Sequence, residues 1–280
     1  MNERAIGSWR RRIGRMAWAG AACALLAQPG ASARAQRPGG RGFFRSREAP
    51  DTTVHNPRYD GRFTFARIAF TTNSLAGYYY MGLPAWAHGY PTAERNLMRI
   101  MQSVTLLDAR PDHTVVVRLG DPLLFKYPVA YMTEADYCGM TDTEAAQLRA
   151  YLLKGGFVIF DDFRDDGRDG YAGWANFARQ MHRVLPEGQI VDLHPSDPIF
   201  HSFFDISSFS IVPQYYDRGA PVFRGIYEDN DPSKRLMVMI NFNTDVSNFW
   251  EFSDNGWYPV AESNEAYKLG VNYVTYALTH

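Results

Sequence analysis

Apolar and polar positions follow a helical rhythm and then a strand rhythm over residues 141–162. Thr141 and Glu144 have the spacing of a capping box, in which each side chain satisfies a free backbone N–H group of the first helical turn. Gly155 and Gly156 follow and allow the left-handed turn that ends many helices. The stretch therefore predicts a helix, a tight stop and a strand. The apolar positions of the helix recur at helical spacing, at Ala145, Leu148 and Leu152.

The strand in this stretch covers residues 157–160 and is apolar on both faces, as strands covered by helices on both sides are. Asp161 and Asp162 follow where it ends, and open α/β sheets bind their ligands at the carboxyl ends of strands. Successive strand residues point to opposite faces, so we expect one of the two aspartates to face the sheet's crevice and the other a helix. A strand-end aspartate can also serve only as a cap for a loop.

Similar patterns predict further elements on either side of this stretch. The segment 77–89 is rich in glycine and aromatic residues and reads as a long loop. Strands that alternate with helices favour an α/β fold with parallel pairing and right-handed crossovers. The predicted strands cover residues 63–70, 115–119, 128–133, 189–193, 222–227 and 236–241. The predicted helices start near Thr92, run over about 171–185 and 266–278, and form a short turn at 198–204.

The first 60 residues read as segments that precede the folded domain. Residues 1–35 combine an arginine-rich start, a short apolar run and small residues before a cleavage site after Ala35, which is the pattern of an export signal. An uncleaved anchor or an amphipathic helix is the alternative. The arginine run is compatible with export by the Sec route or by the twin-arginine route. Trp9 precedes the arginine pair, where twin-arginine signals usually have Ser or Thr, so both routes stay open. Residues 36–60 read as a flexible Arg/Gly/Pro-rich leader, and residues 61–280 as a single α/β domain.

Charge and cysteine content narrow the classes of partner. Residues 1–35 hold six of the 29 basic residues and one of the 30 acidic ones, which leaves 23 basic and 29 acidic residues, a net charge of −6. That balance argues against nucleic acid and anionic membrane surfaces as partners. After removal of residues 1–35 the chain keeps one cysteine, Cys138, and no apolar run that could span a membrane. We expect an exported protein, periplasmic in location, without internal disulfides.

A series of short motifs in one fixed order carries a family resemblance from about Gly61 to His280. With these motifs the chain resembles a bacterial family known as domain of unknown function 4159. That family is similar in fold to class I glutamine amidotransferases and to trehalose-utilisation-type proteins. The resemblance implies a flavodoxin-like three-layer sandwich with a mostly parallel central sheet, and it implies no activity. The motifs are Tyr90-Pro91, Asn96-Leu97, Asp121-Pro122, Phe125 to Pro128, Tyr131 to Thr133, Leu148-Arg149, Tyr151-Leu152, Gly155 to Phe157, Asp161-Asp162, Pro198 to Phe200, Asn243 to Asp245, Trp250-Glu251, Leu269 to Asn272 and Tyr276 to His280.

Two features separate this chain from an amidotransferase. Many family members continue the Tyr-Met-Thr strand with Gly-His, whereas this chain has Glu134-Ala135 there, so no role for that histidine carries over. An amidotransferase also needs a nucleophile elbow, a Gly-x-Cys-x-Gly turn that joins a strand directly to a helix. Cys138 lies between the predicted strand and helix with the wrong spacing, and acidic neighbours raise the pKa of a thiol. We therefore expect no elbow and no glutaminase activity.

The candidate ligand site lies at the strand carboxyl ends. The strands that end at Thr133 and Asp162 are consecutive and joined by one crossover helix, so we expect them side by side. Carboxylates gathered there would repel one another unless a cation, an arginine or a proton intervened. Arg67, Arg118 and Arg164 are the candidate arginines. The candidate site residues are Thr133, Glu134, Asp161, Asp162, Asn243 and Asp245.

Two functions from different classes are compatible with these residues. The first is a non-catalytic binding or interaction module of the cell envelope, whose partner is a small polar ligand or an envelope protein. Asn243 and Asp245 beside Trp250 suit a sugar-like ligand. The alternative is that these polar residues only form a turn and bond to their own backbone. The second is a hydrolase or transferase that uses Glu134 and one aspartate as acid and base. The histidines show no metal-ligand spacing with one another, so we predict neither a metal nor a cofactor.

Overall fold

A computed structural model describes the part of the chain that carries the family resemblance. All the described residues belong to one compact unit. The predicted export signal and most of the predicted leader lie outside these residues, so both remain predictions. None of the helices within the described ranges is both long enough and apolar enough to cross a membrane. The described residues are 56–72, 79–80 (backbone only), 83–164, 173–210, 212, 214–215 and 219–280.

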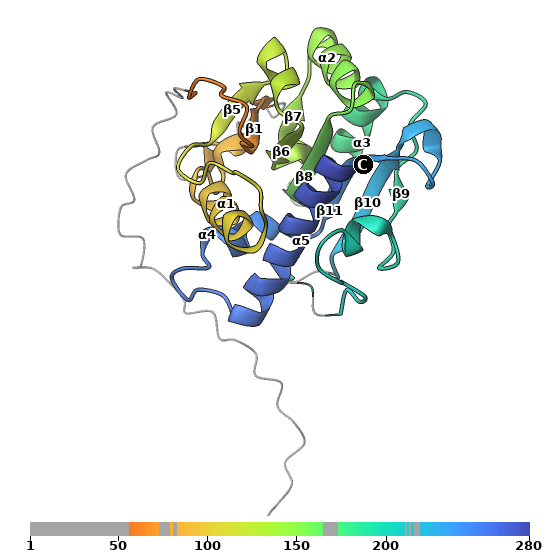
Figure 1. Cartoon of the computed structure of the whole chain (residues 1–280). Helices are drawn as coiled ribbons and strands as arrows, with labels where there is room; N and C mark the ends of the chain where they lie inside the picture. The colour runs from red at the N-terminus through yellow and green to blue at the C-terminus, as the bar shows by residue number, and fades with distance from the viewer. Residues whose placement is uncertain are drawn as a thin grey trace, which may run out of the picture. The chain divides into compact units, whose positions relative to one another are not determined.

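A seven-stranded sheet in the order β5-β1-β6-β8-β11-β10-β9 forms the centre of the described fold (Figure 1). Two short antiparallel pairs lie outside it: β2 (Thr71–Thr72) pairs with β7 (Cys138–Gly139), and β3 (Tyr79–Tyr80) with β4 (Leu83–Pro84). The strands of the central sheet are β1 (Ala66–Ala69), β5 (Val115–Arg118), β6 (Val129–Thr133), β8 (Phe157–Phe163), β9 (Val191–Asp192), β10 (Val222–Tyr227) and β11 (Leu236–Phe242).

The first five strands in the order of the sheet pair in parallel and confirm the flavodoxin-like arrangement. Numbered along the chain, β1, β5, β6, β8 and β11 take the spatial order 2-1-3-4-5 of that fold. Strands β10 and β9 pair antiparallel instead, so the prediction of parallel pairing was wrong for them. The reason is local: β10 connects to β11 through the short 3₁₀ helix η6 (Glu228–Asn230), and a hairpin reverses the chain.

Helices cover both faces of the sheet and complete the three layers (Figure 1). On one face lie α1 (Thr92–Val104), α4 (Val246–Glu251) and α5 (Val260–Thr279). On the other lie α2 (Asp142–Leu153) and α3 (Gly173–Val184). The other 3₁₀ helices within the described residues are η1 (Ala85–Ala87), η2 (Pro122–Lys126), η3 (Ala135–Tyr137) and η5 (Pro198–His201).

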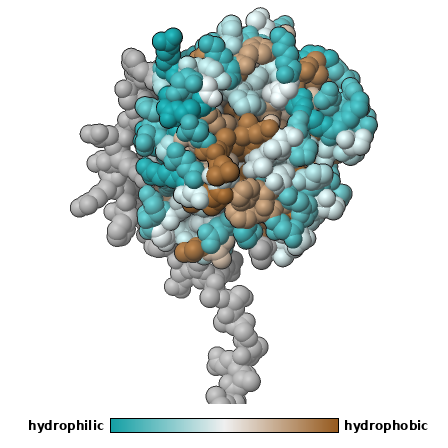
Figure 2. Space-filling model, in the orientation of Figure 1, coloured by the Kyte–Doolittle hydropathy of each residue, from teal (hydrophilic) through white to brown (hydrophobic). Residues whose placement is uncertain are grey.

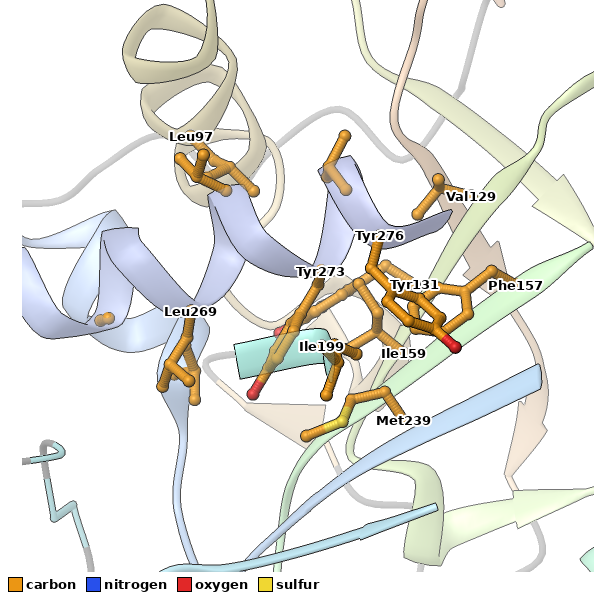
Figure 3. Packing of buried hydrophobic residues seen from close by; sticks show 14 of the residues in the cluster. Leu97, Val129, Tyr131, Phe157, Ile159, Ile199, Met239, Leu269, Tyr273 and Tyr276 are labelled. Atoms are coloured by element: carbon orange, nitrogen blue, oxygen red, sulfur yellow. The ribbon is translucent and has the colours of Figure 1, made fainter. Parts of the chain in front are cut away.

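Alternation along the central strands divides the core into two apolar layers. On β6 and β8, Tyr131 and Ile159 face α1 and α5, as Figure 3 shows. Their neighbours Met132 and Phe160 face α2 and α3. Each such buried side chain contributes about 1.5–3 kcal/mol relative to an exposed one. The same alternation places Asp161 and Asp162, at the end of β8, on opposite faces of the sheet.

The predicted boundaries differ from the structure at several places. The closing helix, predicted over 266–278, begins at Val260 in α5, and the segment 77–89, predicted as a loop, contains β4 and η1. Thr141 caps α2 through the predicted capping box with Glu144. Thr92 is the first residue of α1 rather than its cap. Strand β8 continues through Asp161 and Asp162 to Phe163, because the backbone of this segment still forms hydrogen bonds with the adjacent chain segments. For example, the Glu134 N–H group donates to the Asp161 carbonyl at 3.0 Å. Helix α4 was not predicted at all.

The two edges of the central sheet differ in how they end. Strand β9 has two residues and closes one edge. At the other edge, the side-chain amide of Asn56 pairs with the backbone of β5 as a strand would. Its Nδ2 donates to the Val116 carbonyl at 2.7 Å, and its Oδ1 accepts from the Val116 N–H group at 2.9 Å. The outward N–H and carbonyl groups of Val116 in β5 are therefore satisfied by a side chain.

An apolar groove of about 670 Å³ runs beside the carboxyl ends of α1 and α5. Val104, Leu106 and Leu278 line it and are exposed. Figure 2 shows apolar side chains gathered on the face of the molecule that carries α5 in Figure 1. This groove lies among residues of the helix layer and includes none of the candidate site residues.

Candidate ligand site at the strand ends

The order of the parallel strands places a crevice at a defined point. In flavodoxin-like sheets ligands bind where the strand order reverses, between the first and third strands of the chain. Here those strands are β1 and β6, which are neighbours in the sheet. The loop after β1 supplies His88, and the residue after β6 is Glu134. Asp162 comes from the adjoining strand β8. Three segments that are distant in sequence thus meet at the carboxyl edge of the sheet.

His88, Glu134 and Asp162 form a tight cluster at this edge. The His88 Nδ1 atom lies 2.6 Å from Asp162 Oδ2 and 3.3 Å from Glu134 Oε1. The Thr133 hydroxyl lies 3.4 Å from Asp162 Oδ2. The side chains of His88 and Glu134 each keep 11% of their surface exposed, and Asp162 keeps 2%. The cluster is therefore buried but reaches the surface through two of its members.

Arg67 holds the loop that carries His88. Its Nη1 group donates to the backbone carbonyls of Trp86 and His88, each at 3.2 Å. Its Nε group pairs with Glu94 Oε1 at 2.5 Å, and both side chains are buried. Arg67 therefore balances Glu94 and positions His88 through the backbone, rather than facing the strand-end carboxylates as was expected. Arg118 is exposed on β5, while the charge of Arg164 lowers the pKa of Asp136.

Polar residues in a left-handed conformation follow or end three neighbouring strands. Glu134 after β6, Asp162 in β8 and Asn243 after β11 have φ angles of 51°, 58° and 59°. Such angles cost a residue other than glycine on the order of 1 kcal/mol or more, and they concentrate at functional sites. At Glu134 and Asp162 the bend turns the chain so that both carboxylates meet His88.

Asp161 points to the opposite face and belongs to the framework of the fold. Its carboxylate accepts from the Tyr131 hydroxyl and from Asn241 Nδ2, the latter at 3.0 Å. The N–H groups of Val246 and Ser247, in the first turn of α4, donate to it at 3.2 and 2.9 Å. Four donors on one carboxylate tie β6, β8, β11 and α4 together. Asp161 is fully buried and contributes no atom to the cluster.

The remaining predicted site residues, Asp245 and Asn243, make hydrogen bonds to other parts of the fold. Asp245 is the N-cap of α4 and accepts from the Asn248 backbone at 2.9 Å and its side-chain amide at 2.8 Å. Asn243 donates to the Ala220 carbonyl at 3.0 Å. The Trp250 indole is buried and donates to the Ala266 carbonyl at 2.8 Å. The ring of Trp250 is therefore part of the core and offers no exposed face to a ligand.

Burial and mutual repulsion control the protonation of this region. Burial lowers the pKa of His88, but Asp162 and Glu134 raise it by more, so it stands well above its usual value. Burial and the charge of Asp162 raise the pKa of Glu134, Asp136 and Asp245 well above their usual range. Burial raises the pKa of Asp161 to about 6, even though the bond from Tyr131 lowers it. The strand ends therefore form an acidic region in which His88 is the charge partner of Asp162.

Cys138 lies in β7 rather than in a loop, and its side chain is buried. Burial raises the pKa of its thiol, with a further contribution from Glu144. Helix η3 and β7 separate the end of β6 from the start of α2, so no sharp strand-to-helix turn exposes the sulfur. The expected absence of a nucleophile elbow is confirmed by this connection.

The comparison with known families decides the membership of the chain. A family profile described as "Domain of unknown function (DUF4159)" matches residues 71–278. The chain belongs to the DUF4159 family. No curated protein matches it. The matched segment contains β2 to α5 and includes all three residues of the DUF4159 chain's strand-end cluster.

Sequence patterns identified two members of the cluster and missed His88. Glu134 and Asp162 follow the ends of predicted strands, whereas His88 lies in a segment expected to be a long loop. The contact between His88 and Asp162 spans 74 positions. The available signal was topological: His88 follows the first strand, and the loop after that strand borders the crevice in this fold.

Proposed function

We propose that this DUF4159 chain is a non-catalytic ligand-binding domain of the bacterial cell envelope, with its ligand site at the strand carboxyl ends. The observation that carries the proposal is the cluster of His88, Glu134 and Asp162 at the point where the strand order reverses. Buried ionisable groups are costly to the fold and gather where a ligand compensates for the cost. The partly exposed His88 and Glu134 give a ligand access.

The chemistry of the cluster indicates the class of ligand. Carboxylate oxygens accept hydrogen bonds and attract positive charge, and the surrounding acidic groups repel anions. A hydroxyl-rich or amine-bearing molecule, or a metal cation, is therefore favoured over a phosphate or a carboxylic acid. The Thr133 hydroxyl beside Asp162 adds a group that both donates and accepts.

The spacing of the carboxylates supports binding over hydrolysis. The ligand atoms of His88, Glu134 and Asp162 all lie within 4.8 Å of one another. Glycosidase carboxyl groups flank the bond that they cleave and stand about 5–9.5 Å apart. Two carboxylates that contact the same imidazole are well placed to bind a proton or a cation. They are poorly placed to act from opposite sides of a bond that is cleaved.

The location in the envelope is part of the same proposal and is supported by the leader sequence. Cleavage after Ala35 would give a protein that begins at Gln36. N-terminal sequencing of the protein from the periplasmic fraction of its host tests this. A first residue of Gln36 is expected, and an intact Met1 end in that fraction would overturn the export proposal.

Thermal unfolding with a panel of small molecules tests the binding proposal. Mannitol, glucose, spermidine and divalent chlorides are compared with sodium phosphate and acetate as anionic probes. A rise in the unfolding temperature is expected with at least one polyol, sugar, amine or cation and with neither anion. Glu134→Gln should abolish it, and Asp254→Asn, which changes an exposed acid, should not. A response only to anions, or one that survives Glu134→Gln, would refute the proposal.

A further inference from the structure

A nitrogen atom lies between two carboxylates from separate strands in the strand-end cluster. His88 Nδ1 contacts Asp162 Oδ2 at 2.6 Å and Glu134 Oε1 at 3.3 Å. The Nδ1 atom can carry one hydrogen, which bonds well to only one of these oxygens. Three atoms that converge in this way present lone pairs to a common centre.

The separations of His88 Nδ1 from the two carboxylate oxygens are close to those around a single metal ion, and all three ligand atoms lie within 4.8 Å of one another. Imidazole nitrogen and carboxylate oxygen bind Zn²⁺ at about 2.0–2.2 Å, which places neighbouring ligand atoms about 3–3.5 Å apart. The distance between His88 Nδ1 and Glu134 Oε1 is already in that range. The contact between His88 Nδ1 and Asp162 Oδ2 needs to open by less than 1 Å, a change that side-chain rotation supplies.

We propose that His88, Glu134 and Asp162 bind one divalent first-row transition-metal ion. The inference rests on the proposed function of the strand-end site and names the ligand class that the three residues select. A nitrogen ligand with two carboxylates suits Zn²⁺, Mn²⁺ or Fe²⁺, whereas Mg²⁺ and Ca²⁺ take oxygen ligands. The two positive charges of one such ion would also balance the negative charges of the two carboxylates.

The residues around the cluster resemble the outer shell of a metal site. Arg67 fixes the backbone at His88 through two carbonyl bonds, and the Thr133 hydroxyl lies beside Asp162. Residues that bond to metal-binding side chains or to their backbone fix the orientation of those side chains, and they are a regular component of metal sites. With three protein ligands the site leaves further coordination positions for water or a small molecule, as open metal sites do.

Metal titration of the full chain tests the inference. The protein is stripped with a chelator, dialysed, and titrated with Zn²⁺ and Mn²⁺ by calorimetry, with Mg²⁺ and Ca²⁺ as comparison ions. Saturable binding of one ion per chain is expected for Zn²⁺ or Mn²⁺. His88→Ala and Glu134→Gln should each weaken it by about tenfold or more. Circular dichroism verifies that both variants are folded.

A matched control separates the cluster from exposed histidines. His201 also contacts an aspartate, with Nδ1 at 2.6 Å from Asp205 Oδ1, but this pair is exposed. His201→Ala should leave the affinity unchanged. Co²⁺ gives a second readout: its visible absorption bands should appear with the wild type and change in His88→Ala.

Four results would overturn the inference. The first is no saturable binding of any transition-metal ion by the wild type, and the second is wild-type affinity in both cluster variants. The third is loss of binding in His201→Ala only, and the fourth is a preference for Mg²⁺ or Ca²⁺. If metal ions fail while a polyol or amine still raises the unfolding temperature through Glu134, the proposed function stands and the metal inference alone is wrong. If neither binds, both fail.

Discussion

The two adjacent aspartates of β8 should respond in opposite ways to the same substitution. Asp161 accepts four hydrogen bonds, two of them from backbone N–H groups at the start of α4. Asp162 contacts His88 and has a φ of 58°. We predict that Asp161→Asn lowers the free energy of unfolding strongly, whereas Asp162→Asn leaves it unchanged or raises it.

The magnitude for Asp161→Asn follows from its donors. An asparagine places an NH₂ group where one carboxylate oxygen stood. The Tyr131 hydroxyl or the Asn241 amide can reorient to accept from it, but the N–H group of Val246 or Ser247 cannot. One buried N–H group is then left unsatisfied at about 1–3 kcal/mol, and a charge-assisted bond weakens, so the expected loss is about 2–4 kcal/mol.

Asp162→Asn is the matched substitution one residue away. Asparagine keeps an oxygen that accepts from His88, and it tolerates a positive φ better than most residues. It also removes a negative charge that raises the pKa of Glu134, Asp136 and Asp245. The change in the free energy of unfolding should therefore stay within about 1 kcal/mol of zero or be stabilising.

Urea unfolding without added ligand measures both variants. The tryptophans of the folded domain, Trp86, Trp174, Trp250 and Trp257, supply the fluorescence signal, and far-UV circular dichroism checks that both probes report one transition. Equal m-values are required before the midpoints are compared. A loss of several kcal/mol from Asp162→Asn would make that residue structural and remove the basis of the proposed site. An unchanged stability in Asp161→Asn would refute the four-donor argument.

Three further predictions concern buried polar groups outside the cluster. Arg67→Met should lower the free energy of unfolding by about 3–5 kcal/mol, because it leaves Glu94 buried and unpaired. Adding Glu94→Leu should restore part of this free energy in urea unfolding, and no restoration would contradict the pairing of Arg67 with Glu94. Asn272 accepts from the N–H groups of Phe203 and Phe204 and donates to two carbonyls. Asn272→Asp should therefore lower the free energy of unfolding by about 2–4 kcal/mol in the same assay. An unchanged free energy of unfolding would show that these four hydrogen bonds do not stabilise the fold. The Cys138 thiol should not react with a disulfide reagent until the protein unfolds, and Cys138→Ser should fold as the wild type does; rapid labelling of the native protein would reopen a nucleophilic role.

The parts of the fold that sequence predicted correctly depend on local signals. The capping box at Thr141 and Glu144 and the apolar run of β8 need only neighbouring residues. The antiparallel direction of β10 follows from its short connection to β11 through η6, which is too short to be a crossover α-helix, and the periodicity of the strands does not show this. Helix α4 was missed because Asp245 reads as a turn residue, although an aspartate three residues before Asn248 is also a helix cap.

The candidate site was harder to predict, because its chemistry depends on which face each side chain takes. Alternation indicates that Asp161 and Asp162 point apart, but it does not say which of them meets the crevice. The donors from Val246 and Ser247 decide this, and they lie more than 80 positions away from Asp161. His88 required the path of the whole loop after β1. Contacts of this range are fixed by packing, which a single sequence does not reveal.

The amide of Asn56 has a consequence for the behaviour of the protein at high concentration. An open strand edge is a template on which a second chain can add a strand, and this is a route to aggregation. Here a side chain occupies the outward donor and acceptor of Val116, and the opposite edge ends in the two-residue strand β9. Within the described residues, neither edge of the central sheet offers a long row of free backbone groups, so a second chain finds little of either edge to pair with.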